Sequence, residues 1–154
     1  MAESGEVRWQ GKNIRSLGEE FFTSITYIGH RNAIKEELSA LENLRIANGL
    51  AGVTISETEA RETLEQVGLG GREDLPARLL SAGQQRRLAL ARLTTSNAAL
   101  WILDEVLTSL DTSAVTLAKS LIEEHLNKAG IAIIATHQEL GLSAGSFQRL
   151  ELAS

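Results

Sequence analysis

The chain has 154 residues, of which 43% are hydrophobic and 23% charged, so it is long enough to bury the core of a single globular domain. Its net charge of −5 argues against a nucleic-acid-binding surface, which would be basic, and the absence of cysteine excludes disulfide bonds and thiol chemistry. No apolar run approaches the length that spans a bilayer, so we expect no direct membrane span and any membrane link to run through a partner.

The first part of the chain predicts a hairpin and then a strand. Over residues 5–17, Val7 and Trp9 alternate with polar residues, and Gly11-Lys12-Asn13 supplies a turn. Residues 24–29 are rich in β-branched and aromatic side chains, which is typical of a strand. His30 follows this strand, and its imidazole could accept a hydrogen bond from a water molecule. A surface histidine without a role is the alternative.

No phosphate-binding loop is found in the sequence. Gly11-Lys12 fails as one because Asn13 replaces the required Ser or Thr, Glu6 stands where a Gly is needed, and no buried strand precedes it. The pattern Gly-x-x-x-x-Gly-Lys-[Ser/Thr] occurs nowhere in the 154 residues.

Residues 31–80 predict a helical insertion. Ser39 with Glu42 forms one capping box, and Ser56 with Glu59 forms another, each followed by apolar residues at helical spacing. Gly68 is the expected stop of the second helix.

A third capping box, Ser81 with Gln84, predicts a helix that begins at Ala82. The free N–H groups and the positive dipole end of such a helix favour an anion. Gly83 has no side chain that would block a phosphate. An ordinary capped helix without a ligand is the alternative.

Residues 99–103 form a short apolar run, as expected of a strand buried on both faces of a parallel sheet. Ligands of open α/β sheets bind beyond the carboxyl ends of the strands, which is where Asp104 and Glu105 lie. An Asp at this place can hold Mg²⁺, and the adjacent Glu can polarise an attacking water. Two solvated acids at a strand end are the alternative.

The last part of the chain predicts a helix and two strands. Asp111 can cap an amphipathic helix over residues 111–128, which Gly130 would stop. Residues 131–135 predict another buried strand, and residues 147–152 alternate as a final one.

Taken together, these segments resemble the motifs of ABC-transporter ATPases in order and spacing. Leu80-Ser81-Ala82-Gly83-Gln84 is similar to the signature sequence, with Ala82 where Gly is commoner, and residues 99–105 to the Walker B strand with its catalytic Glu. Ser109-Leu110-Asp111 resembles the D-loop, and residues 133–137 the strand that ends at the switch histidine. Val106 departs from the family, which often has Pro there.

The resemblance extends over nearly the whole chain from Gly5, and it implies a fold. The class is α/β, a P-loop NTPase with a three-layer core and an N-terminal truncation that removes Walker A. The core would comprise residues 1–30 and 81–154, and residues 31–80 would form a helical subdomain.

The resemblance also implies roles for single residues in ATP hydrolysis. The catalytic residues would be Glu105 and His137. The metal Mg²⁺ would be held by Asp104 and His30, the latter in the place of the usual Q-loop Gln. The residues that contact ATP would be Ser81, Ala82, Gly83, Gln84, Asp111 and His30. The implied partners are a second ATPase subunit and transmembrane permease subunits, which would hold the chain at the cytoplasmic side of the membrane.

Residues 29–44 and 80–93 most resemble the ATPases of cytochrome c maturation, which belong to a haem-handling exporter complex. Because Walker A is missing, we expect the 154 residues alone to hydrolyse little or no ATP. One alternative is a non-hydrolysing interaction subunit, or a truncated product, that docks on an intact ATPase or a membrane partner. Another is a soluble ABC protein of DNA repair or translation, which the acidic composition disfavours.

Overall fold

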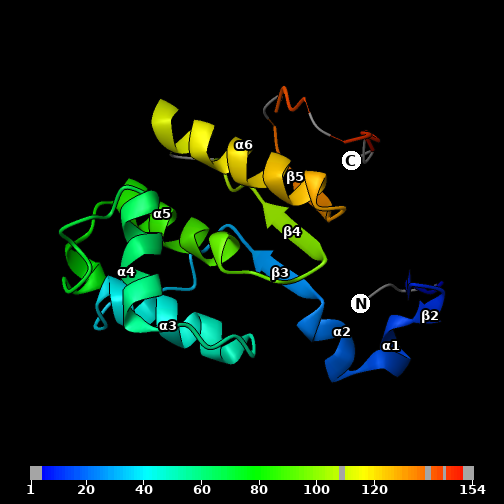
Figure 1. The fold of residues 1–154 in the computed structure, drawn as a ribbon. Helices are drawn as coiled ribbons and strands as arrows, with labels where there is room; N and C mark the ends of the chain where they lie inside the picture. Colours follow the sequence, from blue (N-terminus) through cyan, green and yellow to red (C-terminus); the bar gives the residue numbers. More distant parts are fainter. Residues whose placement is uncertain (1–4, 108–109, 138–139, 144, 151–154) are drawn as a thin grey trace.

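A small parallel sheet lies at the centre of the computed structural model, which describes residues 5–107, 110–137, 140–143 and 145–150 (Figure 1). Its strands are β3 (Ile25–Ile28), β4 (Leu100–Asp104) and β5 (Ile131–Ala135), in the order β3-β4-β5. Both pairings are parallel. The three predicted strands are therefore confirmed to within about one residue at each end.

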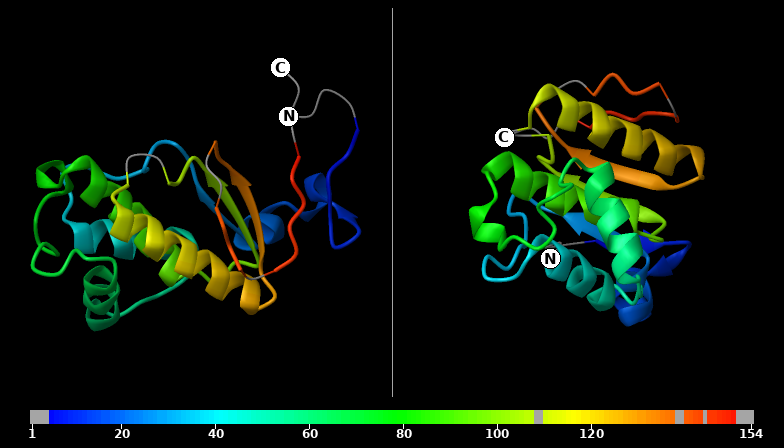
Figure 2. Two further views of the ribbon diagram at one scale, coloured as in Figure 1. Left: turned by 90° about the horizontal axis from the view of Figure 1, so that it is seen from above. Right: turned by 60° about the vertical axis from the view of Figure 1, so that its left-hand side comes forward.

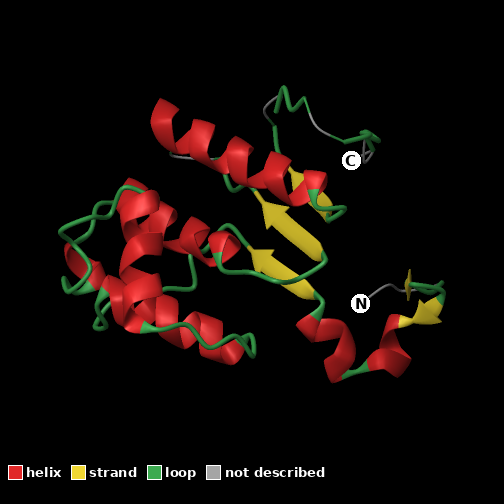
Figure 3. Cartoon of the chain, viewed as in Figure 1, coloured by secondary structure: helices red, strands yellow, loops and turns green. Residues whose placement is uncertain are grey.

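The N-terminal segment forms a shorter hairpin than predicted. Strands β1 (Arg8–Trp9) and β2 (Lys12–Asn13) pair antiparallel, and two short helices follow, α1 (Ile14–Leu17) and α2 (Glu19–Thr23). The prediction of a hairpin up to residue 17 is wrong at its end, because the Asn13 side chain accepts a hydrogen bond from the Arg15 N–H and caps α1. Figure 3 shows this segment at one side of the sheet.

Residues 31–80 contain helices, as predicted. They form α3 (Ala40–Leu50), α4 (Glu57–Gln66) and the short 3₁₀-helix η1 (Ala77–Leu79). Both predicted capping boxes are present, at Ser39 with Glu42 and at Ser56 with Glu59. This region contributes most of one hydrophobic core, whose most deeply buried large side chains are Leu44, Leu64, Val67 and Leu69.

Two longer helices follow, α5 (Ala82–Thr94) and α6 (Thr112–Asn127) (Figure 2). Helix α5 contacts α3, α4 and β3, whereas α6 packs against α5 and β5. Leu88 and Ala91 of α5 belong to the core of the helical region. Three further α5 side chains, Ala89, Leu90 and Leu93, pack in the second core with the strands and α6. Helix α5 is therefore shared by the two cores.

One face of the sheet is not covered by the described helices. Ile131 and Ile133 of β5 are 50% and 56% exposed, and Tyr27 of β3 lies in the same row of the sheet as Ile133 and is also exposed. The prediction that residues 131–135 form a strand is confirmed, but the prediction that this strand is buried is wrong for one of its faces. Their side chains alternate, and only Ala132 and Ile134 pack against the core.

The predicted final strand, residues 147–152, is wrong over the residues that the structure describes. Residues 147–150 form no strand, and Phe147 and Leu150 are exposed. Residues 151–152 of that prediction lie outside the described residues.

The core beside β5 contains a stacked pair of rings. The His125 imidazole lies on the buried Trp101 indole, with ring centroids 3.9 Å apart and planes within 5° of parallel. The His125 Nε2 lies 3.2 Å from the Ile131 carbonyl oxygen. Burial lowers the pKa of His125, so the ring packs here in its neutral form.

We expect Gly130→Ala to destabilise the protein because the new Cβ would overlap the His125 ring and displace it from Trp101. Overpacking of this kind costs about 1–3 kcal/mol. Urea unfolding followed by tryptophan fluorescence measures the change. Gly49→Ala is the matched control, since a Cβ there meets nothing within 4 Å. Equal midpoints for the two variants would contradict the prediction.

Candidate functional site

The candidate site lies at the edge of the sheet where the strands end. Asp104 is the last residue of β4, and Glu105 follows with a φ of +50°. A positive φ is strained for a residue with a side chain and occurs often at functional sites. Two contacts hold this turn: the Glu105 N–H donates to the Ala135 carbonyl, and the Glu105 carbonyl accepts from Arg86.

Two imidazoles flank the Glu105 carboxylate. The His30 Nδ1 lies 3.6 Å from Glu105 Oε2, and the His137 Nε2 lies 3.4 Å from Glu105 Oε1. Glu105 is one-third exposed, whereas the side chains of His30 and His137 are 73% and 94% exposed. The carboxylate therefore sits at an open edge, between two groups that can each accept or donate a proton.

Helix α5 begins as predicted. The Ser81 hydroxyl accepts from the Gln84 N–H, and the Gln84 amide oxygen accepts from the Ser81 N–H. The cap thus uses polar atoms of both side chains, while Ser81 and Ala82 are exposed and Gly83 is half-buried. The first turn of α5 is open to a ligand that approaches from outside this chain.

Asp111 caps helix α6, as predicted. Its carboxylate accepts from the Ala114 N–H at 2.8 Å and from the Arg87 guanidinium at 2.7 and 2.9 Å. These hydrogen bonds, with Arg87 first, lower the pKa of Asp111 from 3.8 to about 2. Residue 109 of the predicted Ser109-Leu110-Asp111 motif lies outside the described residues.

The low pKa of Asp111 makes its contribution to stability sensitive to acid. Because the folded value is below the unfolded one, the contribution is present above pH 3.8 and is lost as the pH falls through about 2. We expect Arg87→Ala to raise the pKa of Asp111 towards 3.8. Carboxyl carbon NMR titration measures this, and Arg61→Ala, which removes the partner of Asp74 instead, is the control. An unchanged Asp111 titration in Arg87→Ala would overturn the prediction.

Two arginines of α5 that the sequence reading passed over contact the predicted site. The guanidinium of Arg86 is buried and donates to the carbonyls of Gly29 and Glu105, and Arg87 holds Asp111. Arg86 is spaced as the buried Ala89, Leu90 and Leu93 are, so it lies on an apolar helix face. A charged residue at an apolar position of a helix was therefore the sequence feature that could have indicated a role for Arg86.

The structure brings some of the predicted site residues together but not all. His30, Glu105 and His137 meet, and Asp104 adjoins them. No hydrogen bond or ion pair joins residues 81–84 to that group within the described part of the chain. Over the same residues, no three His, Asp or Glu side chains form a cluster that could hold a metal ion by themselves. The assignment of Asp104 and His30 to a metal therefore stays a prediction.

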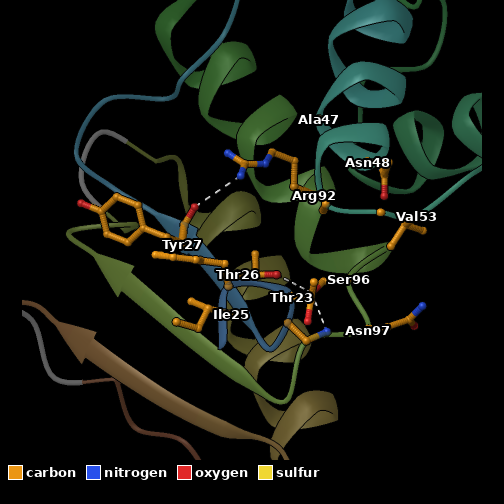
Figure 4. Close-up of a pocket in the computed structure, with 14 residues that line it drawn as sticks. Thr23, Ile25, Thr26, Tyr27, Ala47, Asn48, Val53, Arg92, Ser96 and Asn97 are labelled. Atoms are coloured by element: carbon orange, nitrogen blue, oxygen red, sulfur yellow. Dashed lines mark hydrogen bonds between the residues drawn. The ribbon is translucent and has the colours of Figure 1, made fainter. Parts of the chain in front are cut away.

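A cavity of about 330 Å³ opens on another side of the molecule, among α2, β3, the end of α3 and the end of α5 (Figure 4). Phe22, Ala47 and Val53 give it apolar walls. The Arg92 guanidinium projects into it and donates to the Tyr27 carbonyl at 3.4 Å. Among the described residues no carboxylate pairs with Arg92, and burial lowers its pKa. The cavity thus combines apolar walls with an uncompensated cation.

No helix in residues 5–107, 110–137, 140–143 and 145–150 has both the length and the apolar character to cross a membrane.

Comparison with known sequences gives a consistent family. Residues 1–108 match the family model described as "ABC transporter". The chain is 52% identical over 148 residues to the cytochrome c biogenesis ATP-binding export protein CcmA of Nitrosospira multiformis, covering 96% of this chain and 72% of that protein. It is 50% identical over 153 residues to the protein of the same name from Nitrosomonas europaea, covering 99% of this chain and 72% of that protein.

Solved structures show the same fold. A putative ABC transporter ATP-binding protein from Pyrococcus furiosus superposes with a TM-score of 0.75 at 25% identity, covering 90% of this chain and 67% of that one. A dimeric ATP-binding cassette bound to ADP and Pi superposes with a TM-score of 0.74 at 21% identity, covering 88% of this chain. The present chain spans 64% of the length of that second structure.

Proposed function

This chain belongs to the ABC transporter family, and from that premise we propose that it is the ATP-binding and ATP-hydrolysing part of a complex that exports haem for cytochrome c biogenesis. The family hydrolyses ATP. The name of the 52% identical relative supports the finer assignment to cytochrome c biogenesis. Haem as the cargo extends the resemblance of residues 29–44 and 80–93, and it is part of the proposal.

The observation that carries the proposal is the position of Glu105 between two imidazoles at the open edge of the sheet. In this proposal Glu105 orients the water that attacks the γ-phosphate, and His137 contacts that phosphate and keeps Glu105 in place. The Asp104 carboxylate is the natural Mg²⁺ ligand of the group, since Mg²⁺ prefers oxygen. Imidazole suits Mg²⁺ poorly, so His30 would act through a water molecule.

The open start of α5 fits a second part of the proposal. Among the described residues no hydrogen bond or ion pair joins residues 81–84 to the Glu105 group, so we assign them to the nucleotide of a second ATPase subunit. Their N–H groups and the dipole of this 13-residue helix would face its γ-phosphate. Asp111, fixed by Arg87, would lie at the same interface.

We assign the cavity around Arg92 to the permease partner. Its apolar walls suit the buried side of a short helix, and Arg92 suits an acidic side chain on that helix. Exposed Ile46 of α3 lines a neighbouring cavity that shares Val53 with the first. Such docking would hold the chain at the cytoplasmic face of the membrane.

The 154 residues alone are expected to show little Mg²⁺-dependent ATP turnover because they contain no Gly-x-x-x-x-Gly-Lys-[Ser/Thr] loop for the β- and γ-phosphates. Phosphate release by the purified chain, compared with its Glu105→Gln variant, measures this. Equal background rates for both are the expected result. Robust turnover that disappears with Glu105→Gln would contradict it.

A second candidate is a subunit that lends α5 to an intact ATPase without hydrolysing ATP itself. The exposed start of α5 at Ser81 and Ala82 favours it. The test mixes the chain with a complete family ATPase whose own signature serine has been replaced. Restored turnover that requires Ser81 would support this function. Reading the coding sequence upstream of Met1 separates the two candidates, since an in-frame phosphate loop there would favour a hydrolysing subunit.

A further inference from the structure

Arg86 is a buried cation whose contacts are spread over two segments. Only 5% of the residue is exposed. On one side its Nη1 donates to the Gly29 carbonyl at 2.8 Å and to the Asn32 amide oxygen at 2.9 Å. On the other side its Nε donates to the Val106 carbonyl at 3.1 Å, and its Nη2 donates to the Glu105 carbonyl at 2.8 Å.

These two segments carry the groups that meet at the sheet edge. His30 lies between Gly29 and Asn32, and Glu105 lies between Asp104 and Val106. The strands that precede them, β3 and β4, are paired up to the register Ile28 opposite Leu103, and beyond it the ladder ends. Beyond the last paired residues, the planar Arg86 guanidinium joins the two segments through its hydrogen bonds.

The surroundings explain why an arginine can be buried here. Burial lowers the pKa of Arg86, and the nearby charges of Asp104 and Glu105 partly oppose this shift. The acceptors of its hydrogen bonds are carbonyl and amide oxygens. Five donor–acceptor contacts in different directions, including a long one of 3.5 Å from Nη2 to the Asp104 carbonyl, need the planar fork of a guanidinium. A lysine carries its three donors on a single nitrogen and lacks the planar fork that spans both segments.

We propose that Arg86 is a positioning residue that sets the distance between His30 and Glu105 by tying residues 29–32 to residues 104–106. Its acceptor at Glu105 belongs to a residue in a strained backbone conformation, and the hydrogen bond helps hold that conformation. The effect on catalysis rests on the proposed ATP hydrolysis. The structural effect does not.

The test uses Arg86→Lys in the chain without nucleotide and reads the imidazole NMR signals of its three histidines. We expect the signals of His30 and His137 to move and that of His125, in the core, to stay. Hydrogen exchange of amides in residues 29–32 and 104–107 should rise by about tenfold or more, since hydrogen bonds to a charged group are lost. Arg87→Lys, next in the helix and bonded to Asp111, is the control and should leave His30 and His137 unmoved.

Two further measurements keep the proposal testable if Arg86→Lys folds poorly. Asn32→Ala removes one hydrogen-bond acceptor of Arg86 beside His30. It should raise the hydrogen exchange of the amides in residues 104–107, as Arg86→Lys does. In the unaltered chain, the Arg86 Nη–H signals should be separate and slow to exchange, because every partner is fixed. Averaged, rapidly exchanging Nη–H signals, or unmoved imidazole signals in Arg86→Lys, would overturn the proposal and leave ATP hydrolysis by the complex untouched. In the assembled transporter, Arg86→Lys should lower kcat and leave the KM for ATP unchanged.

Discussion

Replacement of Glu105 by Gln is expected to lower the ATP turnover of the assembled transporter by roughly 10²–10⁴-fold, the usual contribution of a positioned general base. Gln has nearly the same size and keeps an oxygen between His30 and His137, so the loss is one of charge rather than of packing. Nucleotide binding should persist, because in the proposed mechanism the substituted atom would act on the attacking water and not on the bound phosphates. Steady-state phosphate release and nucleotide titration calorimetry on the same preparation separate the two effects.

Glu62→Gln on the exposed side of α4 is the matched control for this experiment, since it makes the same chemical change away from the site. It should leave turnover unchanged. If Glu105→Gln kept more than a tenth of the turnover, another group would have to activate the water. If it abolished nucleotide binding as well, Glu105 would be a ligand of the nucleotide or its metal.

The meeting of the three site residues could be predicted from topology. His30, Glu105 and His137 each follow the end of a different strand, and parallel strands bring their carboxyl ends to one edge. The backbone conformation of Glu105 could not be predicted. Its positive φ is held by two hydrogen bonds, one from its N–H to the Ala135 carbonyl and one from Arg86 to its own carbonyl. The hydrogen bonds of Arg86 could not be predicted from the sequence either, since the one to the Gly29 carbonyl joins residues 57 apart.

The same division applies to the fold. A capping box needs only two residues three positions apart, so the starts of α3, α4 and α5 followed from local sequence. The burial of β5, in contrast, could not be predicted from local sequence. An apolar run states which side chains can be buried, whereas burial depends on what packs against each face of the strand. Here α5 and α6 pack on one face only, and Ile131 and Ile133 point away from them.

Leu90→Ala is expected to be the most destabilising of the substitutions considered for the core. Leu90 is fully buried and packs between α5 and the sheet, in the helix that both cores share. Removing such a side chain costs about 2–5 kcal/mol, through lost burial and the cavity left behind. Domains are stable by only about 5–15 kcal/mol, so this one change would remove a large share. Urea unfolding monitored by circular dichroism measures it.

Leu79→Ala provides the control, because Leu79 is 60% exposed in η1 and its truncation should change stability by no more than about 0.5 kcal/mol. The shared helix adds a sharper expectation. Because Leu88 and Ala91 of the same helix belong to the other core, loosening α5 at Leu90 should raise amide exchange in α3 and α4 as well as in the sheet. Exchange confined to the sheet would mean that the two cores unfold separately, and α5 would then be a boundary between them rather than a link.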